Sequence, residues 1–207
     1  MAFQYKRRDA ENWEKREKQQ GNDFKGVIKD DIKTWTPQKG DNHIRILPPT
    51  WEDATHYGLD VYVHYGIGPD RASALCMNKM LGEKCPLCEE KMRADRAGNE
   101  ELSKELSAGK RVAVWMIDRK EPQAGPMIWT MPWTLDREFV KACKDRTSGE
   151  IYAMDDPDAG YNVSFERTGD GITTKYIGVQ LDRRASSVDP EIIEYIVAEP
   201  LTAALVY

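Results

Sequence analysis

A chain of 207 residues with 40% hydrophobic residues is long enough to form one folded domain with a substantial core, plus arms. No apolar run approaches the roughly 20 residues that cross a bilayer, and the first residues lack the apolar core of a signal peptide. We therefore expect a cytoplasmic protein without a membrane segment. The formal net charge of −5 excludes a global attraction to nucleic acid, so binding of a polyanion would require a local basic groove.

The first 26 residues are predicted to form an arm. Charged residues and Gln dominate residues 6–20. Two interpretations stay open for this segment. One is a solvated helix stabilised by charge pairs four residues apart, and the other is an interaction arm led by the basic cluster Lys6, Arg7 and Arg8.

From about residue 33 the pattern of the sequence indicates short β-strands. The strand candidates, in chain order, are 33–36, 43–47, 59–65, 111–118, 127–131, 161–167 and 173–181. A turn sequence at 168–171 predicts that the last two strands form a hairpin. Helical patterns cover about 88–106, 135–143 and 189–197. The order predicts a mainly β (α+β) fold, a small curved barrel with helical additions.

Three cysteines and one histidine form the most informative motif. His64, Cys76, Cys85 and Cys88 follow the spacing H-x11-C-x8-C-x2-C, and a Cys3His set is a common closed shell for tetrahedral zinc. Four protein ligands leave no position for water or substrate, so the motif predicts one structural Zn²⁺ and no enzymatic activity. A redox pair is the alternative for Cys85 and Cys88, but it would need a thioredoxin-like unit, which the sequence does not indicate.

The fourth ligand has two candidates. His64 lies in an alternating run that predicts a strand, which would hold its imidazole in a fixed direction. His56 lies in a polar loop and is the alternative. Cys143, in a helical stretch, is interpreted as a small buried hydrophobic residue.

Basic and aromatic side chains share the non-core faces of several predicted strands. Along 111–118, Val112, Val114 and Met116 point one way, while Arg111, Ala113, Trp115 and Ile117 point the other. Cations that track phosphates and rings that stack on bases are what single-stranded nucleic acid requires. The competing interpretation is that Trp35, Trp115 and Trp129 are core residues.

The sequence resembles a known protein family. The motif from His64 to Cys88 looks like the zinc site of the single-stranded-DNA-binding, helix-destabilising proteins of T-even-type tailed bacteriophages. Residues 39–48 are similar to the family strand that enters its barrel, and residues 112–119, followed by a Pro-containing loop, resemble a further strand. The late hairpin also fits. The resemblance covers roughly residues 30–185.

The resemblance implies an OB-fold-like five-stranded barrel over 27–185, with a zinc subdomain inserted at about 60–108 and a helical segment at 186–207. It implies sequence-independent binding of single-stranded DNA in phage replication, recombination and repair, inside the infected host cell. Self-association along the DNA and contacts with phage replication proteins would accompany this role. Carried over by position, the DNA-contacting residues would be Arg45, Tyr62, Arg111, Trp115 and Arg119, with Lys33, Trp35 and Lys79 behind them.

Two features depart from the family pattern. The basic cluster at residues 6–8 lacks the neighbouring hydroxyl residue of the family's cooperativity arm, and the last residues, 200–207, are apolar where the family has an acidic tail. Either such a tail was removed or this member regulates itself differently. The alternatives in other classes are a zinc-ribbon accessory that binds protein or duplex DNA, and an RNA-binding OB protein.

Overall fold

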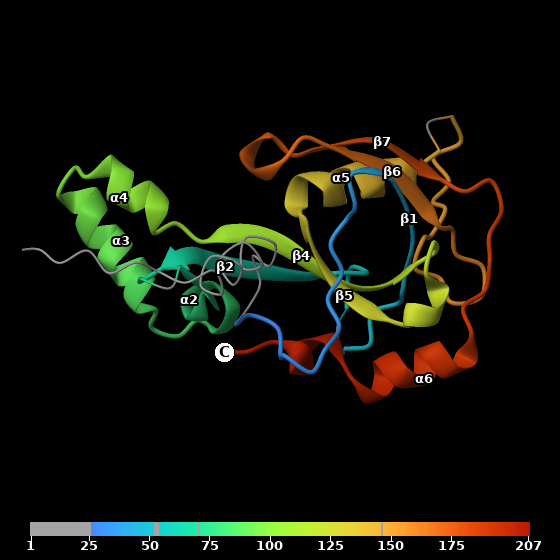
Figure 1. Cartoon of the computed structure of the whole chain (residues 1–207), viewed down its shortest axis with the longest axis horizontal. Helices are drawn as coiled ribbons and strands as arrows, with labels where there is room; N and C mark the ends of the chain where they lie inside the picture. The colour runs from blue at the N-terminus through green and yellow to red at the C-terminus, as the bar shows by residue number, and fades with distance from the viewer. Residues whose placement is uncertain (1–25, 52–53, 70, 146) are drawn as a thin grey trace, which may run out of the picture.

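The computed structural model describes residues 26–51, 54–69, 71–145 and 147–207 (Figure 1). The strands are β1 (Gly40–Ile46), β2 (Leu59–Ile67), β3 (Ala72–Leu75), β4 (Gly109–Asp118), β5 (Met127–Pro132), β6 (Val163–Thr168) and β7 (Lys175–Leu181). The helices are α2 (Met77–Leu81), α3 (Pro86–Arg96), α4 (Glu100–Glu105), α5 (Trp133–Ala142) and α6 (Pro190–Ala198), with 3-10 turns η1 (Pro122–Ala124), η2 (Gly171–Thr173) and η3 (Leu201–Ala204). None of these helices is long and apolar enough to cross a membrane. The basic cluster at residues 6–8 lies outside the described residues.

Strand β4 pairs with neighbours along both of its edges. On one edge its last residues pair with β1, where Ile44 lies opposite Asp118, and its first residues pair with β2, where Val63 lies opposite Gly109. On the other edge it pairs with β5 over most of its length. The two strands β1 and β2 therefore follow one another along a single edge of β4. This arrangement joins the curved part of the sheet to an extension that carries β2, β3 and the helices α2 to α4 (Figure 1).

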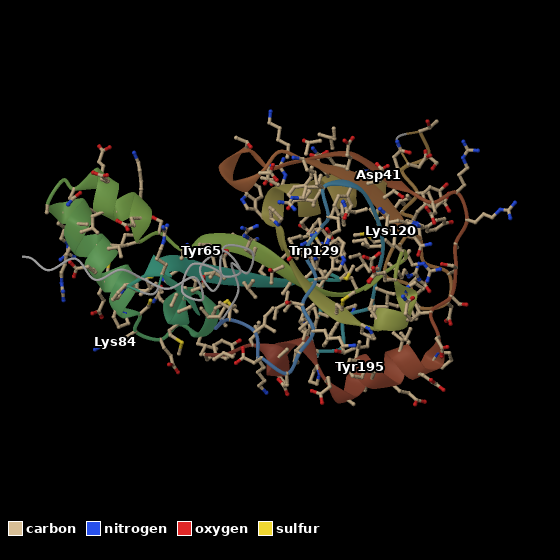
Figure 2. The ribbon with its side chains drawn as sticks, in the orientation of Figure 1. Asp41, Tyr65, Lys84, Lys120, Trp129 and Tyr195 are labelled. Atoms are coloured by element: carbon tan, nitrogen blue, oxygen red, sulfur yellow. The ribbon has the colours of Figure 1, made fainter. Side chains whose placement is uncertain are left out.

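One face of β4 lies in the core of the curved sheet. Val112, Val114 and Met116 are all buried there, which confirms that they share a face. The same core holds Trp129, in the middle of the curved sheet in Figure 2, with its ring stacked on Phe165 at 5.5 Å between centroids. Helix α5 closes this core from the side, because Leu135 and Phe139 on one helical face, together with Cys143 just after the helix, are buried against it. The interpretation of Cys143 as a buried hydrophobic residue is confirmed.

The opposite face of β4 is buried as well. Ala113, Trp115 and Ile117 pack against residues from both ends of the described chain, including Val27 and Leu205. The backbone N–H of Val206 donates to the carbonyl of Val27, which ties these two segments together. Tyr195, labelled on α6 in Figure 2, places its ring edge-on to that of Trp115, with 5.8 Å between the ring centroids. The apolar C-terminal segment thus covers the face on which we expected exposed aromatic residues.

The predicted mainly β (α+β) class is confirmed, and the sheet itself is open. Its order is β3-β2-β4-β1-β6-β7, with β5 on the other side of β4, and no described pairing joins β5 to β7. The single helix expected over 88–106 is two helices, because Gly98 turns the chain at φ 71° and Asn99 caps the start of α4. The strand expected at 33–36 is reduced to a bridge between Thr34 and Ile128. The late hairpin and the short C-terminal helix form as predicted.

Truncation of Leu201 tests the second core. Leu201 is completely buried in it, so Leu201→Ala should lower the free energy of unfolding by about 3 kcal/mol through lost transfer energy and the cavity left behind. Urea denaturation of the two proteins measures the difference. The neighbouring Thr202 is exposed, so Thr202→Ala should change stability by less than about 0.5 kcal/mol. Equal effects of the two substitutions would contradict the packing described above.

Candidate metal centre

Four potential ligands converge from separate elements of the extension. The side-chain ligand atoms of His64, Cys76, Cys85 and Cys88 all lie within 4.8 Å of one another. The Nε2 atom of His64 is 3.4 Å from the sulfur of Cys85 and 3.7 Å from that of Cys88, which in turn is 3.4 Å from the sulfur of Cys76. The structure brings His64 into this group. His56 lies elsewhere, with its Nε2 3.6 Å from a carboxylate oxygen of Asp136.

Local structure places each cysteine. Cys76 follows β3 and caps α2, and its own backbone N–H donates to the carbonyl of Tyr62 on β2 at 2.8 Å. Cys85 caps α3 from an extended conformation, and Pro86 begins the helix at the position where its missing N–H costs nothing. Cys88 lies in the first turn of the same helix. The two-residue gap therefore turns both sulfurs toward one point in front of the helix N-terminus.

The imidazole of His64 is oriented by a hydrogen bond on its far side. Its Nδ1 lies 2.9 Å from the carbonyl oxygen of Leu106, which follows α4 and can only accept. Nδ1 therefore carries the proton and donates, which leaves the lone pair of Nε2 directed at the cysteine sulfurs. Burial lowers the pKa of His64, which favours the neutral imidazole that binds metals.

The thiols are electrostatically crowded. Burial raises the pKa of Cys88 to about 12, and hydrogen bonds and charge repulsion from Cys76 and Cys85 act in the same direction. Burial also acts to raise the pKa of Cys85. Hydrogen bonds from the backbone N–H groups of Cys88 and Leu87 and from the thiols of Cys88 and Cys76 outweigh this effect, so the pKa of Cys85 is lowered. Three thiolates so close together are stable only beside a strong positive charge. A bound divalent cation supplies that charge and deprotonates coordinating thiols.

The geometry and the donor set fit zinc. Tetrahedral zinc with bonds of about 2.3 Å to sulfur has ligand-to-ligand distances of about 3.7 Å, close to the 3.4–3.7 Å seen between neighbouring ligand atoms here. Thiolates and imidazole are the ligands that structural zinc prefers. No carboxylate belongs to the described cluster. His64, Cys76, Cys85 and Cys88 would thus fill all four positions, and the ion would act on folding alone.

The extension has little else to hold it together. Helix α2 has no buried residue, α3 buries only Ala94, and α4 buries only Ser103. Their packing against β2 and β3 therefore supplies little hydrophobic stabilisation, in contrast to the two cores on β4. A cross-link through the Cys3His cluster would compensate for that deficit, as in small metal-dependent domains.

Three of the residues expected to contact DNA are buried in the structure, which corrects those expectations. Arg45 is 1% exposed and donates to the carbonyls of Asp156 and Ser186, so its charge is used inside the protein. Trp115 is 2% exposed, beneath α6. Trp35 is 9% exposed, and its indole N–H donates to Asp118 at 2.9 Å. For Arg45 and Trp115 the strand alternation held, but other segments cover the face that was expected to be open. For Trp35 the expected strand is only a bridge, and the indole packs into the core while Lys33 stays exposed.

The remaining predicted residues lie at the surface but not in one place. Arg111 is half-buried and donates through Nε to the Tyr65 hydroxyl at 3.1 Å. Arg119 is exposed, and Lys33 donates to the carbonyl of Ala124. The Lys79 ammonium lies 4.8 Å above the ring of Tyr62 on β2, so the structure brings these two predicted residues together.

Lys110, Trp133 and Arg137 extend this pair across the sheet and were missed in the sequence. Lys110 lies opposite Tyr62 in the β2–β4 pairing and forms a 2.6 Å ion pair with Asp60. On the other edge of β4, Pro132 lies opposite Arg111, so Trp133 begins α5 close to Lys110. The hydrogen bond that Lys110 donates to Asp60 raises the pKa of Lys110, and the negative charge of Asp136 in the first turn of α5 acts in the same direction.

A row of cations and rings results, which we call the Tyr62 face. Its members are Lys79, Tyr62, Lys110, Trp133 and Arg137. Trp133 is 42% exposed, and the Arg137 guanidinium lies 5.4 Å from the centre of its ring. The spacing Trp133–Arg137 at i, i+4 was the one signal in the sequence that could have indicated an exposed pair on a helix.

No protein-family model matches the chain, and no curated protein matches its sequence. The function therefore has to be argued from the metal cluster and the Tyr62 face.

Substitution of one ligand tests the metal centre. We expect the purified protein to hold one zinc ion per chain, and Cys88→Ala to lose it and to unfold at a lower temperature, because the extension has no core of its own. Zinc content by atomic emission and thermal unfolding with and without a chelator measure both effects. Cys143→Ala is the matched control, since it removes a buried thiol outside the cluster and should retain the ion. Full zinc occupancy in Cys88→Ala would contradict the assignment.

Proposed function

We propose that this protein binds single-stranded DNA without sequence preference and carries one structural zinc ion. The observation that supports this most is the Tyr62 face, on which two exposed or half-exposed rings alternate with three basic side chains, of which Lys110 is paired with Asp60 while Lys79 and Arg137 lie beside the rings. Positive groups that follow a phosphate backbone and flat rings that stack on bases are the two requirements of single-strand binding. Replication, recombination and repair, in which single strands are exposed, are the processes that such a protein would serve.

The strand order supports an OB fold as the scaffold. In a Greek key, three consecutive strands are neighbours and the fourth returns to lie beside the first. Leaving aside the inserted β2 and β3, the order β6–β1–β4–β5 has this form, and β7 extends it beyond β6. An OB fold is a five-stranded, partly open Greek-key barrel, and the opening here would lie between β5 and β7, where α5 packs.

The location of the Tyr62 face agrees with that scaffold. OB folds bind oligonucleotides on their second and third strands and on the loop between the first two strands. In this chain the second and third barrel strands would be β4 and β5, which supply Lys110 and lead into Trp133. The connection between the first two strands is the metal-bearing extension, which supplies Tyr62 and Lys79.

The metal cluster would orient the Tyr62 side of this surface. Tyr62 lies two residues before His64 on β2, and its carbonyl accepts from the backbone N–H of Cys76. Lys79 lies on the helix that Cys76 caps, and its backbone N–H lies 3.5 Å from the Cys76 sulfur. Zinc would thus fix the positions of the ring and the ammonium before the strand binds. Pre-organised groups lose less entropy on binding.

The proposed action is stoichiometric and needs no turnover. A protein that binds single strands but not duplex shifts the melting equilibrium of DNA by mass action. Phosphate contacts release counterions, so affinity should fall steeply as salt rises. The net charge of −5 would limit binding away from the Tyr62 face.

Substitution of the two aromatic residues tests base stacking. Trp133 is far more exposed than Trp35, Trp115 or Trp129, so quenching of tryptophan fluorescence by poly(dT) should fall strongly in Trp133→Phe. Tyr62→Ala should weaken poly(dT) binding by about tenfold, the equivalent of one lost stacked base. Tyr207→Ala, which removes an exposed ring at the C-terminus, serves as the control and should leave affinity unchanged.

The same titrations with duplex DNA and poly(U) distinguish the competing functions. Little response to duplex is expected. Equal or tighter binding of poly(U) would favour an RNA-binding protein, and the absence of any binding to poly(dT) would refute the proposal.

The salt dependence of binding tests the phosphate contacts. If Lys79 contacts a phosphate, Lys79→Ala should reduce the slope of log K against log salt concentration by about 0.7, the value for one phosphate on a single strand. Lys104→Ala is the matched control, because Lys104 is an exposed lysine on α4 whose ion pair with Glu100 measures 3.8 Å. An unchanged slope for Lys79→Ala would place this residue outside the binding path.

A further inference from the structure

The two ends of the curved sheet differ in how their edges are covered. The outer edge of β5 is occupied by the chain near Thr34, because Ile128 donates to the carbonyl of Lys33 and accepts from the N–H of Trp35. Strand β7 pairs with β6 on one edge, and no described strand pairs with its other edge. Residues 177–181 therefore direct alternate backbone N–H and C=O groups away from the sheet. Such edges are templates for pairing with another chain.

A groove runs between this edge and helix α5, which lie next to each other in Figure 1. Its volume is about 470 Å³, within the range of roughly 300–1,000 Å³ for ligand sites. Its lining comes from one side of the helix and from the strand, namely Glu138, Lys141, Ala142, Lys144, Tyr176, Ile177, Gly178 and Val179. A sheet edge that faces a helix across a groove is the arrangement in which extended peptides add a strand to a sheet.

The charge of the groove selects the partner. Lys141 forms a 2.6 Å ion pair with Glu138, which neutralises both. Lys144 is exposed and makes no side-chain hydrogen bond or ion pair with another described residue, so one positive charge is left over. Ile177, 47% exposed, adds an apolar contact at the rim. A partner peptide that combines carboxylates with apolar side chains would match both the charge of Lys144 and the apolar surface of Ile177.

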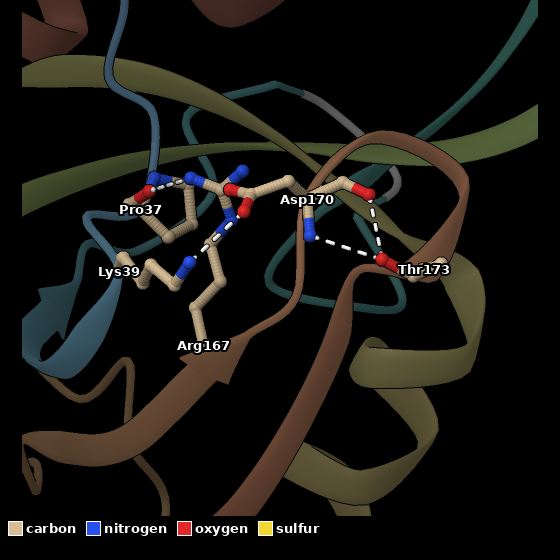
Figure 3. A network of polar contacts seen from close by, with 5 residues as sticks. All are labelled: Pro37, Lys39, Arg167, Asp170 and Thr173. Carbon is tan, nitrogen blue, oxygen red and sulfur yellow. Dashed lines mark hydrogen bonds and ion pairs between the residues drawn. The ribbon is translucent and has the colours of Figure 1, made fainter.

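The hairpin that carries the edge is held in place by polar contacts (Figure 3). Arg167, on β6, donates to the carbonyl of Pro37 at 2.8 Å, and Lys39 pairs with Asp170 at 2.9 Å. Within the turn, the backbone N–H of Asp170 donates to the Thr173 hydroxyl at 3.1 Å. The edge of β7 is thus anchored before a partner arrives, which lowers the entropy cost of adding a strand.

We propose that the groove between β7 and α5 binds an extended, acidic peptide segment of a partner protein, which pairs with β7 as an additional strand. The free edge of β7 favours a peptide over DNA. This edge presents hydrogen-bond donors and acceptors in alternation, and a peptide backbone supplies both kinds of partner, whereas the sugar-phosphate backbone of DNA supplies acceptors alone. The extra residue at Gly178, with φ 67°, shifts the β6–β7 register there, so pairing would begin beside the groove at Ile177, be interrupted at Gly178 and resume from Val179 toward Leu181.

A selection from a displayed library of random 12-residue peptides on the full-length protein tests this. We expect enrichment of sequences that combine Asp or Glu with β-branched residues. A synthetic copy of the most enriched peptide, labelled with a fluorophore, should bind about tenfold more weakly to Lys144→Glu than to the unaltered protein. Lys104→Glu, a charge reversal on α4 of the same kind, should leave the affinity unchanged.

Hydrogen exchange with the same peptide locates the binding site. Pairing should slow the exchange of amides within 177–181, whereas amides of β2 and α3 should keep their rates. The absence of any enriched acidic peptide, full affinity in Lys144→Glu, or protection confined to other elements would each overturn the proposal. So would displacement of the peptide by a dT16 oligonucleotide that protects the same β7 amides, since the groove would then belong to a nucleic-acid path. The proposal does not depend on the Tyr62 face, so failure of one leaves the other standing.

Discussion

The burial of β4 on both faces is the constraint on which the other elements depend. Its even-numbered residues pack into the curved sheet and its odd-numbered residues pack under the C-terminal segment, so both cores include this one strand. Both of its edges are paired, to β1 and β2 on one side and to β5 on the other. Displacing the extension relative to the curved sheet would therefore break backbone pairs of β4 at Lys110 and its neighbours. The positions of Tyr62, Lys110 and Trp133 relative to one another follow from this pairing.

The extension depends on β4 for its position and on the Cys3His cluster for its internal order. Hydrophobic burial stabilises β4 from both faces, but it stops near Arg111, which is only half-buried. Beyond that point the helices bury almost no side chains. Backbone pairing joins β2 to β3, and the cluster is the contact that brings α3 to these two strands. A tetrahedral ion fixes distances and directions, whereas a few apolar contacts would allow several packings. The structural role that we assign to zinc thus explains how a surface of small elements can be rigid.

Features that depend on the spacing of residues along the chain were predicted from the sequence. The H-x11-C-x8-C-x2-C motif indicated a cluster that the structure brings together. Cys85 and Cys88 share the first turn of α3, and His64 lies on β2, next to the strand that leads into Cys76. The alternation along 111–118 correctly separated the two faces of β4. It could not reveal that both faces are covered, since the period of a strand does not say what packs on it. For that reason Trp115 and Arg45 were expected at the surface. Lys110 and Trp133 were missed because only the pairing of β4 with β5 brings them together.

Helix α5 connects the two proposed binding surfaces and also keeps them apart. Trp133 and Arg137 stand at its start on the Tyr62 face, and Lys141 and Lys144 line the groove at its other end. Trp133 and Lys144, the outermost members of the two surfaces, are eleven residues apart, which corresponds to about 16 Å along a helix. That distance exceeds the Debye length of about 8 Å at physiological salt, so charges at the two ends of the helix are largely screened from each other. Arg137 of the Tyr62 face and Glu138 of the groove are adjacent in the sequence, so screening between them is weak. Leu135 and Phe139 fix the helix in the core between these ends. A single strand and an acidic peptide would therefore bind to opposite ends of one helix, and any electrostatic coupling between them would pass through Arg137, Glu138 and Lys141.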